Sequence, residues 1–123
     1  METKQVITSY KDLVVWKKSL LLSTEVYGFT EKFPQKEIYG LTSQMRRSAV
    51  SIPSNIAEGR SRGTRKDFAQ FLRISLGSCA ELETQLEISK QLPETREMDS
   101  SKICGLIEEI TKMLNSMIRK LSH

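Results

Sequence analysis

The sequence predicts an all-α protein, with one domain over residues 1–123 folded as an antiparallel up-down-up-down four-helix bundle. Apolar residues recur with helical spacing in four stretches, while the alternation typical of strands is nearly absent. Short segments containing proline or glycine separate these stretches. A chain of 123 residues suits a single domain with one adequate core. We expect the helices to span about residues 12–33, 35–58, 65–92 and 100–121.

The first expected helix begins at Asp12, a residue suited to the N-cap, and stops at Pro34. Its apolar residues form two stripes. One stripe holds Leu13, Trp16, Leu20 and Tyr27, and the other holds Val15, Leu22, Val26, Phe29 and Phe33. Because an ordinary surface helix needs only one apolar stripe, two stripes predict two sets of neighbours.

The second expected helix keeps its apolar spacing through a proline. Six residues follow a 4-3-4-3-4 spacing: Ile38, Thr42, Met45, Ala49, Ile52 and Ile56. Pro53 lies inside this run, where it removes one backbone hydrogen bond and clashes with the carbonyl four residues earlier. We therefore predict a single helix kinked at Pro53, with Ser48 and Ser51 as partners for the freed backbone groups. Gly59 is expected to end this helix.

The third and fourth expected helices have recognisable ends. Thr64 suits the N-cap of the third helix, with Asp67 in the place of the usual capping-box residue, and Pro93 ends that helix. Its middle carries small residues that let a neighbouring helix approach closely: Ser75, Gly77, Ser78, Cys79 and Ala80. The fourth helix has one wide apolar face, and its last turn carries Arg119 and Lys120, which suit a helix C-terminus.

Catalytic and cofactor sites are not indicated by the sequence. The single histidine, His123, is the last residue, where it cannot be oriented for acid–base chemistry or metal binding. Neither a GxxxxGK[ST] phosphate loop nor a GxGxxG motif occurs. Cys79 and Cys104 match no metal-ligand spacing and are expected to be reduced. We therefore expect no enzyme activity, no cofactor and no metal.

Targeting signals are not apparent either. No segment approaches the roughly 20 apolar residues of a membrane span. The N-terminal residues Met-Glu-Thr-Lys-Gln lack the apolar region of a secretory signal. We expect a cytoplasmic protein with no membrane partner.

Positive charge is concentrated in the middle of the chain. The formal net charge is +4, whereas residues 44–76 carry +5 and residues 77–100 carry −4. The basic residues of the first segment are Arg46, Arg47, Arg60, Arg62, Arg65, Lys66 and Arg73. Guanidinium groups match phosphate geometry, and clustered positive charge attracts a polyanion without reading its sequence. These seven residues are the candidate nucleic-acid-binding residues, and the alternative is a solvated face that keeps the protein soluble.

Other polar residues near this cluster are less informative. The nearest aromatic residues, Phe68 and Phe71, occupy core positions, so base stacking is not predicted. The acidic residues Glu81, Glu83 and Glu87 point in different directions around the third helix, which favours a solvated face over a catalytic or metal site. Two polar residues of the second helix either bind a ligand or tie that helix to its neighbours: Asn55 and Glu58.

The apolar stripes on the first and third helices exceed what one monomer buries. Exposed stripes of this size usually mark an interface, and the alternative is that loops or the N-terminal arm cover them. We expect self-association, with closed cyclic symmetry as the general case.

Several segments resemble one bacterial family. They are Asp12–Lys17, Phe33–Pro34, Tyr39–Arg47, Ser51–Gly59, Phe71–Ser78 and Glu81–Glu83. These strings resemble the four-helix-bundle family of 23S rRNA intervening-sequence proteins, over about residues 10–92. The run Arg46-Arg47 followed by Ser51-Ile-Pro-Ser-Asn-Ile-Ala-Glu-Gly59 is the most specific part. The fourth helix matches only in general character.

The resemblance implies an antiparallel four-helix bundle that assembles as a homopentameric ring and is often encoded within 23S rRNA genes. The general family has no settled biochemical activity. A related protein, the accessory variability determinant of diversity-generating retroelements, has a basic surface that binds nucleic acid and a reverse transcriptase. RNA or DNA, and a nucleic-acid enzyme such as a reverse transcriptase, are therefore the implied partners. The residues that match the family's basic pair and basic turn are Arg46, Arg47, Arg60, Arg62 and Arg65.

Residues and resemblance together predict a non-enzymatic oligomeric scaffold that binds structured RNA or another nucleic acid through an arginine-rich surface. The alternative is a protein-interaction adaptor that binds no nucleic acid.

Overall fold

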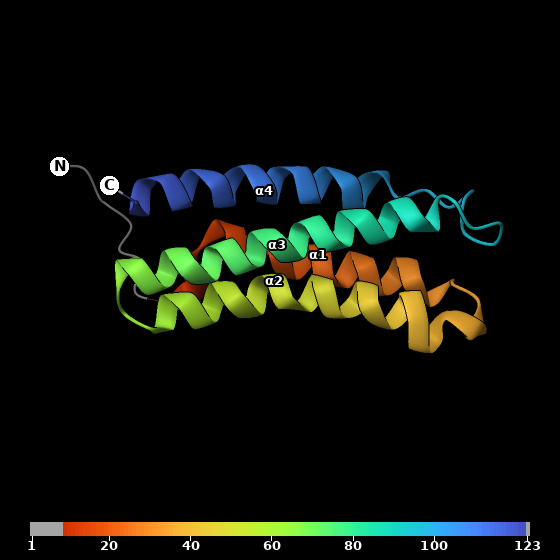
Figure 1. Ribbon diagram of the computed structural model, residues 1–123, viewed down its shortest axis with the longest axis horizontal. Coiled ribbons are helices and arrows are strands. Elements are labelled where there is room, and N and C mark those ends of the chain that lie inside the picture. Colours follow the sequence, from red (N-terminus) through yellow and green to blue (C-terminus); the bar gives the residue numbers. More distant parts are fainter. Residues whose placement is uncertain (1–8, 123) are drawn as a thin grey trace.

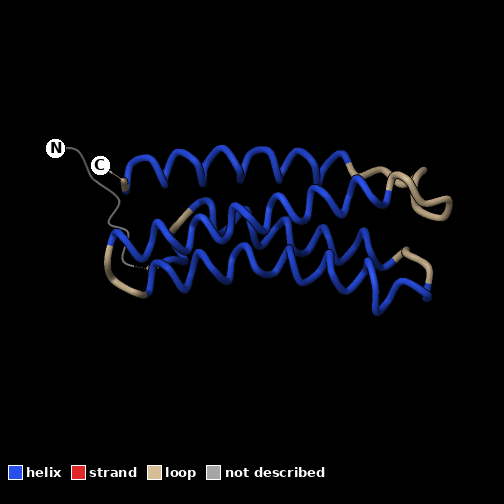
Figure 2. The backbone as a smooth tube through the Cα atoms, in the orientation of Figure 1, coloured by secondary structure: helices blue, strands red, loops and turns tan. Residues whose placement is uncertain are grey.

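The computed structural model describes residues 9–122 and confirms the four-helix bundle (Figure 1). The four long helices are α1 (Val14–Glu31), α2 (Ser43–Ser61), α3 (Arg65–Ser89) and α4 (Ser101–Leu121). Successive helices run antiparallel, and α4 packs against both α3 and α1, which closes the bundle. Short turns η1 (Tyr10–Asp12), η2 (Gln35–Glu37) and η3 (Ile38–Thr42) precede α1 and α2. Strands are absent from residues 9–122 (Figure 2).

The core is a single cluster drawn from all four helices. Its fully buried large side chains include Leu22 and Val26 of α1, Ile52 of α2, Leu72 of α3 and Ile110 of α4. Of the two stripes predicted for the first helix, the one containing Leu22 and Val26 faces this core. The other leaves Leu20 and Tyr27 exposed.

Exposed large apolar side chains are unevenly distributed over the described residues. They are Val14, Leu20, Leu21, Tyr27, Ile38, Tyr39, Val50, Ile74 and Ile88. All of them lie on α1, η3, α2 or α3, and α4 carries none. The outer face of α4 is thus suited to water, whereas the other three helices each expose apolar surface.

Local contacts move several predicted helix ends. Asp12 does not cap α1, because it belongs to the turn η1, which Ser9 caps by accepting a hydrogen bond from the Lys11 backbone N–H at 3.2 Å. The first helix ends at Glu31 instead of Phe33. The third helix begins as predicted, with the Thr64 hydroxyl accepting from the Asp67 N–H at 3.1 Å.

The third helix is three residues shorter than predicted at its other end. It stops at Ser89, whose carbonyl accepts a hydrogen bond from the Thr95 hydroxyl at 2.5 Å. This bond holds the chain in a turn around Pro93, a residue that cannot continue a helix. The α3–α4 connection is therefore folded back onto the end of α3.

A break in helical geometry lies at Gly40, before the start of α2. Gly40 has φ −113° and ψ −112°, and it sits in the π-helical turn η3 just before α2. In contrast, α2 continues through Pro53 from Ser43 to Ser61. The apolar spacing that passes through the proline therefore does mark one helix.

A serine on α1 explains how α2 accommodates Pro53. Proline has no N–H, so the Ala49 carbonyl four residues earlier loses its helical donor. The Ser23 hydroxyl lies 3.1 Å from that carbonyl oxygen, and 3.0 Å from the Ser19 carbonyl oxygen of its own helix. The predicted partners Ser48 and Ser51 do not take this role. The freed carbonyl is bound from another helix, which sequence spacing could not indicate.

The interface of α2 with α3 is close and contains further hydroxyl contacts. The Ser75 hydroxyl donates to the Ile52 carbonyl at 2.9 Å, and the Ser51 and Ser78 hydroxyl oxygens are 2.8 Å apart. These contacts confirm that the small residues of α3 admit a neighbouring helix. Gly59 serves the same close approach, because a Cβ there would lie 2.5 Å from the Phe71 Cβ.

Gly59 therefore does not end α2 as predicted. It lies buried inside the helix, which continues to Ser61. The turn into α3 is made instead by Gly63, whose φ of 87° is unfavourable for other residues. Asn55 ties the middle of α2 together, since its side-chain amide donates to the Ser51 carbonyl at 2.8 Å.

We predict that Ser23→Ala lowers the free energy of unfolding by about 1 kcal/mol, because it leaves the Ala49 carbonyl without a donor. In a Pro53→Ala background the restored N–H reaches that carbonyl, and the cost of Ser23→Ala should fall to about half or less. Urea unfolding of the four proteins of this cycle measures the coupling. The control is Thr24→Ala, which removes an exposed hydroxyl bond to the Leu21 carbonyl on the same helix. Equal costs in both backgrounds would contradict the assigned role of Ser23.

Candidate nucleic-acid interface

The fold gathers positive charge at one end of the bundle, called here the basic end. This end comprises residues 10–20, 54–73 and 112–122, where α1 begins, α2 turns into α3 and α4 finishes (left in Figure 1). These segments carry eleven Lys and Arg side chains against three Asp and Glu. The net charge of this end is +8, and since the whole chain has a net charge of +4, the remaining residues together carry −4. The protein thus has a strongly positive end.

Five of the seven predicted binding residues lie at the basic end: Arg60, Arg62, Arg65, Lys66 and Arg73. Lys66 is exposed and pairs with no other described residue. Arg60 is partly buried. Arg62 is exposed, but it forms an ion pair with Glu58 at 2.9 Å and stacks over the Phe71 ring at 5.0 Å. The surface is therefore made of both unengaged and internally paired cations.

Two arginines of α3 join the basic end to the last turn of α4. An Arg65 guanidinium nitrogen donates to the Lys120 carbonyl at 2.7 Å, and Arg73 reaches the Ser122 hydroxyl at 3.5 Å. Positive charge at a helix C-terminus is favourable, because the last carbonyls carry partial negative charge. These contacts place Arg119 and Lys120 beside the arginines of the α2–α3 turn.

Residues outside the predicted set therefore extend the surface. Arg119 and Lys120 of α4 and Lys11 and Lys17 near the start of α1 are all exposed at this end. In the sequence, Arg119 and Lys120 were recognisable only as basic residues in the last turn of a helix. Their proximity to Arg65 depends on the antiparallel pairing of α3 with α4, so spacing alone could not show it.

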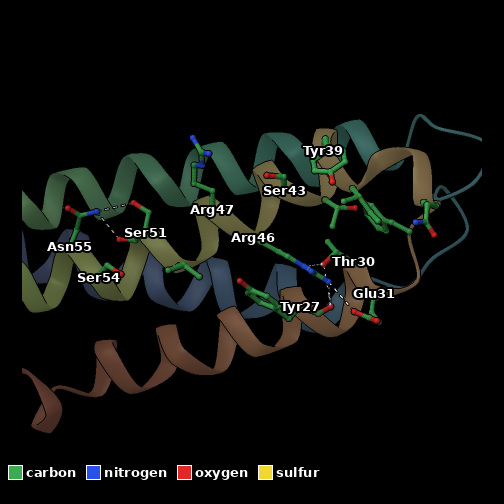
Figure 3. Close-up of a pocket in the computed structure, with 15 residues that line it drawn as sticks. Tyr27, Thr30, Glu31, Tyr39, Ser43, Arg46, Arg47, Ser51, Ser54 and Asn55 are labelled. Carbon is green, nitrogen blue, oxygen red and sulfur yellow. Dashed lines mark hydrogen bonds and ion pairs between the residues drawn. The ribbon is translucent and has the colours of Figure 1, made fainter.

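Arg46, a predicted binding residue, is partly exposed, and its guanidinium is engaged by residues of α1. Its Nε donates to the Thr30 hydroxyl at 2.8 Å, and a terminal nitrogen contacts the Tyr27 carbonyl at 3.3 Å and the Glu31 carboxylate at 3.2 Å (Figure 3). The guanidinium carbon also lies 4.5 Å from the centre of the Tyr27 ring. Arg46 thus fastens α2 to α1.

Arg47 lies apart from the basic end. It is exposed, and its guanidinium pairs with no other residue among 9–122. Along α2 it is about 20 Å from Arg60, given a rise of about 1.5 Å per residue. It lines an open groove of about 1010 Å³ between α1 and α2, together with Tyr27 and Tyr39 (Figure 3). The predicted basic cluster is therefore two separate regions.

Acidic and sulfur-containing side chains form no metal centre in the described part of the chain, where no group of three or more potential ligands occurs. Glu81, Glu83 and Glu87 are exposed, and Glu87 pairs with Lys90 at 3.2 Å. Burial raises the pKa of the Cys79 thiol to about 11, so this group is a neutral thiol at physiological pH. Within residues 9–122, no helix is long and apolar enough to cross a bilayer.

The fold and its surface define a small four-helix-bundle protein with one strongly basic end. The family model for the 23S rRNA-intervening sequence protein matches residues 11–116. The chain therefore belongs to the 23S rRNA-intervening sequence protein family. The match extends through most of α4, beyond the part in which the sequence motifs are recognisable.

A solved structure supports the same assignment. The chain is similar to a protein of unknown function from the S23 ribosomal protein family of Bacteroides thetaiotaomicron VPI-5482, with 30% sequence identity and a TM-score of 0.74. The similarity covers 85% of this chain and 98% of that one. No curated protein matches the chain.

We predict different effects for the two neighbouring arginines of α2. Arg46→Ala should lower the free energy of unfolding by about 1–2 kcal/mol, because it removes charge-assisted hydrogen bonds and a cation–π contact to α1. The matched control is Arg47→Ala, which should change it by less than about 0.5 kcal/mol, as expected for an exposed side chain without partners. Thermal and urea unfolding measure both. A destabilisation of similar size in the two variants would contradict the distinction.

Proposed function

We propose that this protein is a non-enzymatic, self-associating scaffold that binds structured RNA or another nucleic acid through its basic end. The observation that carries the proposal is the excess of eleven basic over three acidic side chains at that end. Charge of one sign gathered on one surface attracts a polyanion at long range and raises the association rate.

The arrangement of the cations supports contact with the phosphate backbone. Arg119, Lys66 and Lys17 are exposed and come from three different helices. Cations spread over several helices present a broad surface without a ridge that would enter a groove and read bases. Arg62 is held over Phe71 and so keeps its guanidinium in a fixed position, which lowers the entropy cost of a phosphate contact.

The alternative is an adaptor that binds only proteins, such as a nucleic-acid enzyme. The exposed apolar side chains of α1 and α3 support this reading, because surfaces of this kind favour protein contacts. The two functions differ in their dependence on salt and on the cations of the basic end. The experiment below separates them.

We predict that the protein binds a fluorescein-labelled RNA hairpin with an affinity that falls steeply as salt increases. The triple variant Lys66→Ala, Arg73→Ala and Arg119→Ala should weaken binding at least tenfold. It should also reduce the slope of log affinity against log salt concentration by about 2, since each lost phosphate contact removes roughly 0.7–0.9 from the slope. Fluorescence anisotropy between 50 and 300 mM salt measures both.

The matched control removes the same number of charges at the opposite end of the bundle, with Lys32→Ala, Arg96→Ala and Lys102→Ala. This variant should keep the slope and most of the affinity. If both triple variants behave alike, binding reflects overall charge and the basic end is not the site. If the parent protein does not bind RNA or DNA at 50 mM salt, the adaptor function is favoured.

We also propose that copies of the chain associate through their α1 and α3 faces. These helices occupy diagonal corners of the bundle, because each packs against α2 and α4. Val14 and Leu21 are exposed on α1, and Ile74 and Ile88 are exposed on α3. Contact between two different faces is heterologous and forms a ring when the rotation closes. Such a ring agrees with the pentamer that the family resemblance implies.

We predict that Ile74→Glu with Ile88→Glu converts the oligomer to a monomer, because both charges would be buried at the proposed interface. Light scattering coupled to size exclusion measures the mass, and circular dichroism checks that the helices persist. The control carries two added carboxylates on α4, at Ser101→Glu and Asn115→Glu, and should keep the parent mass. A monomeric parent, or an unchanged mass in the α3 variant, would refute this interface.

A further inference from the structure

The groove between α1 and α2 combines two exposed aromatic rings with an unpaired cation (Figure 3). Tyr39 is 97% exposed and Tyr27 is 46% exposed. Arg47 lines the same groove and has no partner among the described residues. Proteins that bind unpaired nucleotides commonly stack the bases on exposed aromatic rings and bind the phosphates with nearby cations. Tyr39 lies eight residues before Arg47 in the chain, whereas Tyr27 comes from another helix, and only the fold shows that all three line one groove.

A buried polar atom in the same groove has no partner. The Thr42 side chain lines the groove, is 6% exposed, and its hydroxyl oxygen makes no hydrogen bond within the structure. An unpaired buried hydroxyl costs free energy unless a ligand or water satisfies it. The oxygen itself exposes less than 1 Å² of surface, so it lies beneath the groove lining and is not presented to a ligand there.

Tyr39 is presented by an ordered turn. In η3 the Glu37 carboxylate accepts a hydrogen bond from the Leu41 N–H at 3.3 Å. Gly40 leaves room for that carboxylate, because a Cβ at Gly40 would lie 3.2 Å from Glu37 Oε1. A ring held on a fixed backbone loses little entropy on binding.

The charge of the groove favours an anionic ligand. Glu31 provides the only carboxylate among the residues that line it, and Arg46 already pairs with that carboxylate at 3.2 Å. Arg46 itself is occupied, so the charge available to a ligand is that of Arg47. A ligand that fits therefore carries a flat ring and a negative charge.

We propose that this groove binds unpaired nucleotides of a nucleic-acid strand. A base stacks on Tyr39, and the adjoining phosphate binds Arg47. The proposal rests on the function proposed above and adds the kind of strand recognised. Arg47 and Arg62 are about 22 Å apart along α2, so a strand of several nucleotides connects the groove with the basic end.

The test compares a labelled single-stranded RNA of 12 nucleotides with a fully paired 12-base-pair RNA duplex. Tyr39→Ala should weaken binding of the single strand about tenfold, as expected for loss of one stacked base, and change duplex binding less than twofold. Arg47→Ala should likewise weaken binding of the single strand more than binding of the duplex. Tyr39→Phe keeps the ring face and should retain the parent affinity.

The matched control is Lys32→Ala, an exposed cation outside the groove, which should leave both affinities unchanged. Mass measurement accompanies each variant. An equal loss for both RNAs, or no loss in Tyr39→Ala, overturns the proposal while leaving the basic end as the binding site. A change of oligomeric mass in Tyr39→Ala also overturns it, because the groove would then contact a second copy. Failure of the parent to bind either RNA would instead reject the proposed function itself.

Discussion

The structure depends on how the carbonyls of α2 are satisfied around a buried proline. Pro53 leaves the Ala49 carbonyl without its helical donor, and the Ser23 hydroxyl of α1 lies 3.1 Å from it. Ser75 of α3 donates to the Ile52 carbonyl from another side of the same helix. Directional bonds of this kind fix rotation and register more sharply than apolar contact does, because they tolerate little displacement. The positions of α1 and α3 are thus both set against the middle of α2.

This register determines which arginines are structural and which are available. With α1 fixed against α2, Arg46 meets Thr30 and Glu31, while the adjacent Arg47 points away from that contact (Figure 3). Two consecutive residues on a helix differ by about 100° in direction, so one can be bound and the next unpaired. At the basic end the same division holds, since Arg65 contacts the end of α4 and Lys66 pairs with no described residue.

The surfaces of the bundle differ in charge and in exposed apolar area. The proposed self-association and the proposed nucleic-acid binding therefore use different surfaces. The outer surface of α4 carries no exposed large apolar side chain, whereas α1 and α3 each carry several. Cations gather where α2 meets α3 and α4 ends, and the aromatic groove lies toward the other end of α2. A scaffold that associates through diagonal helices would leave both its basic end and its groove exposed to a nucleic acid.

The sequence by itself determined the helical class, the four helical segments, the start of α3 and the ends of α4. Helical periodicity needs only local side-chain spacing, and caps such as Thr64 act within a few residues, so both are legible in the chain. The sequence also indicated a basic region and an excess of apolar surface on the first and third helices.

Tertiary structure decided which residues share a surface. It separated Arg46 and Arg47 from the basic end, brought Lys120 against Arg65, and placed Tyr27 in the same groove as Arg47. It also supplied, from another helix, the serine that lies against the carbonyl that Pro53 frees, and it placed a break in helical geometry at Gly40. Contacts between residues distant in the chain depend on the register of packed helices, and no local pattern specifies that register.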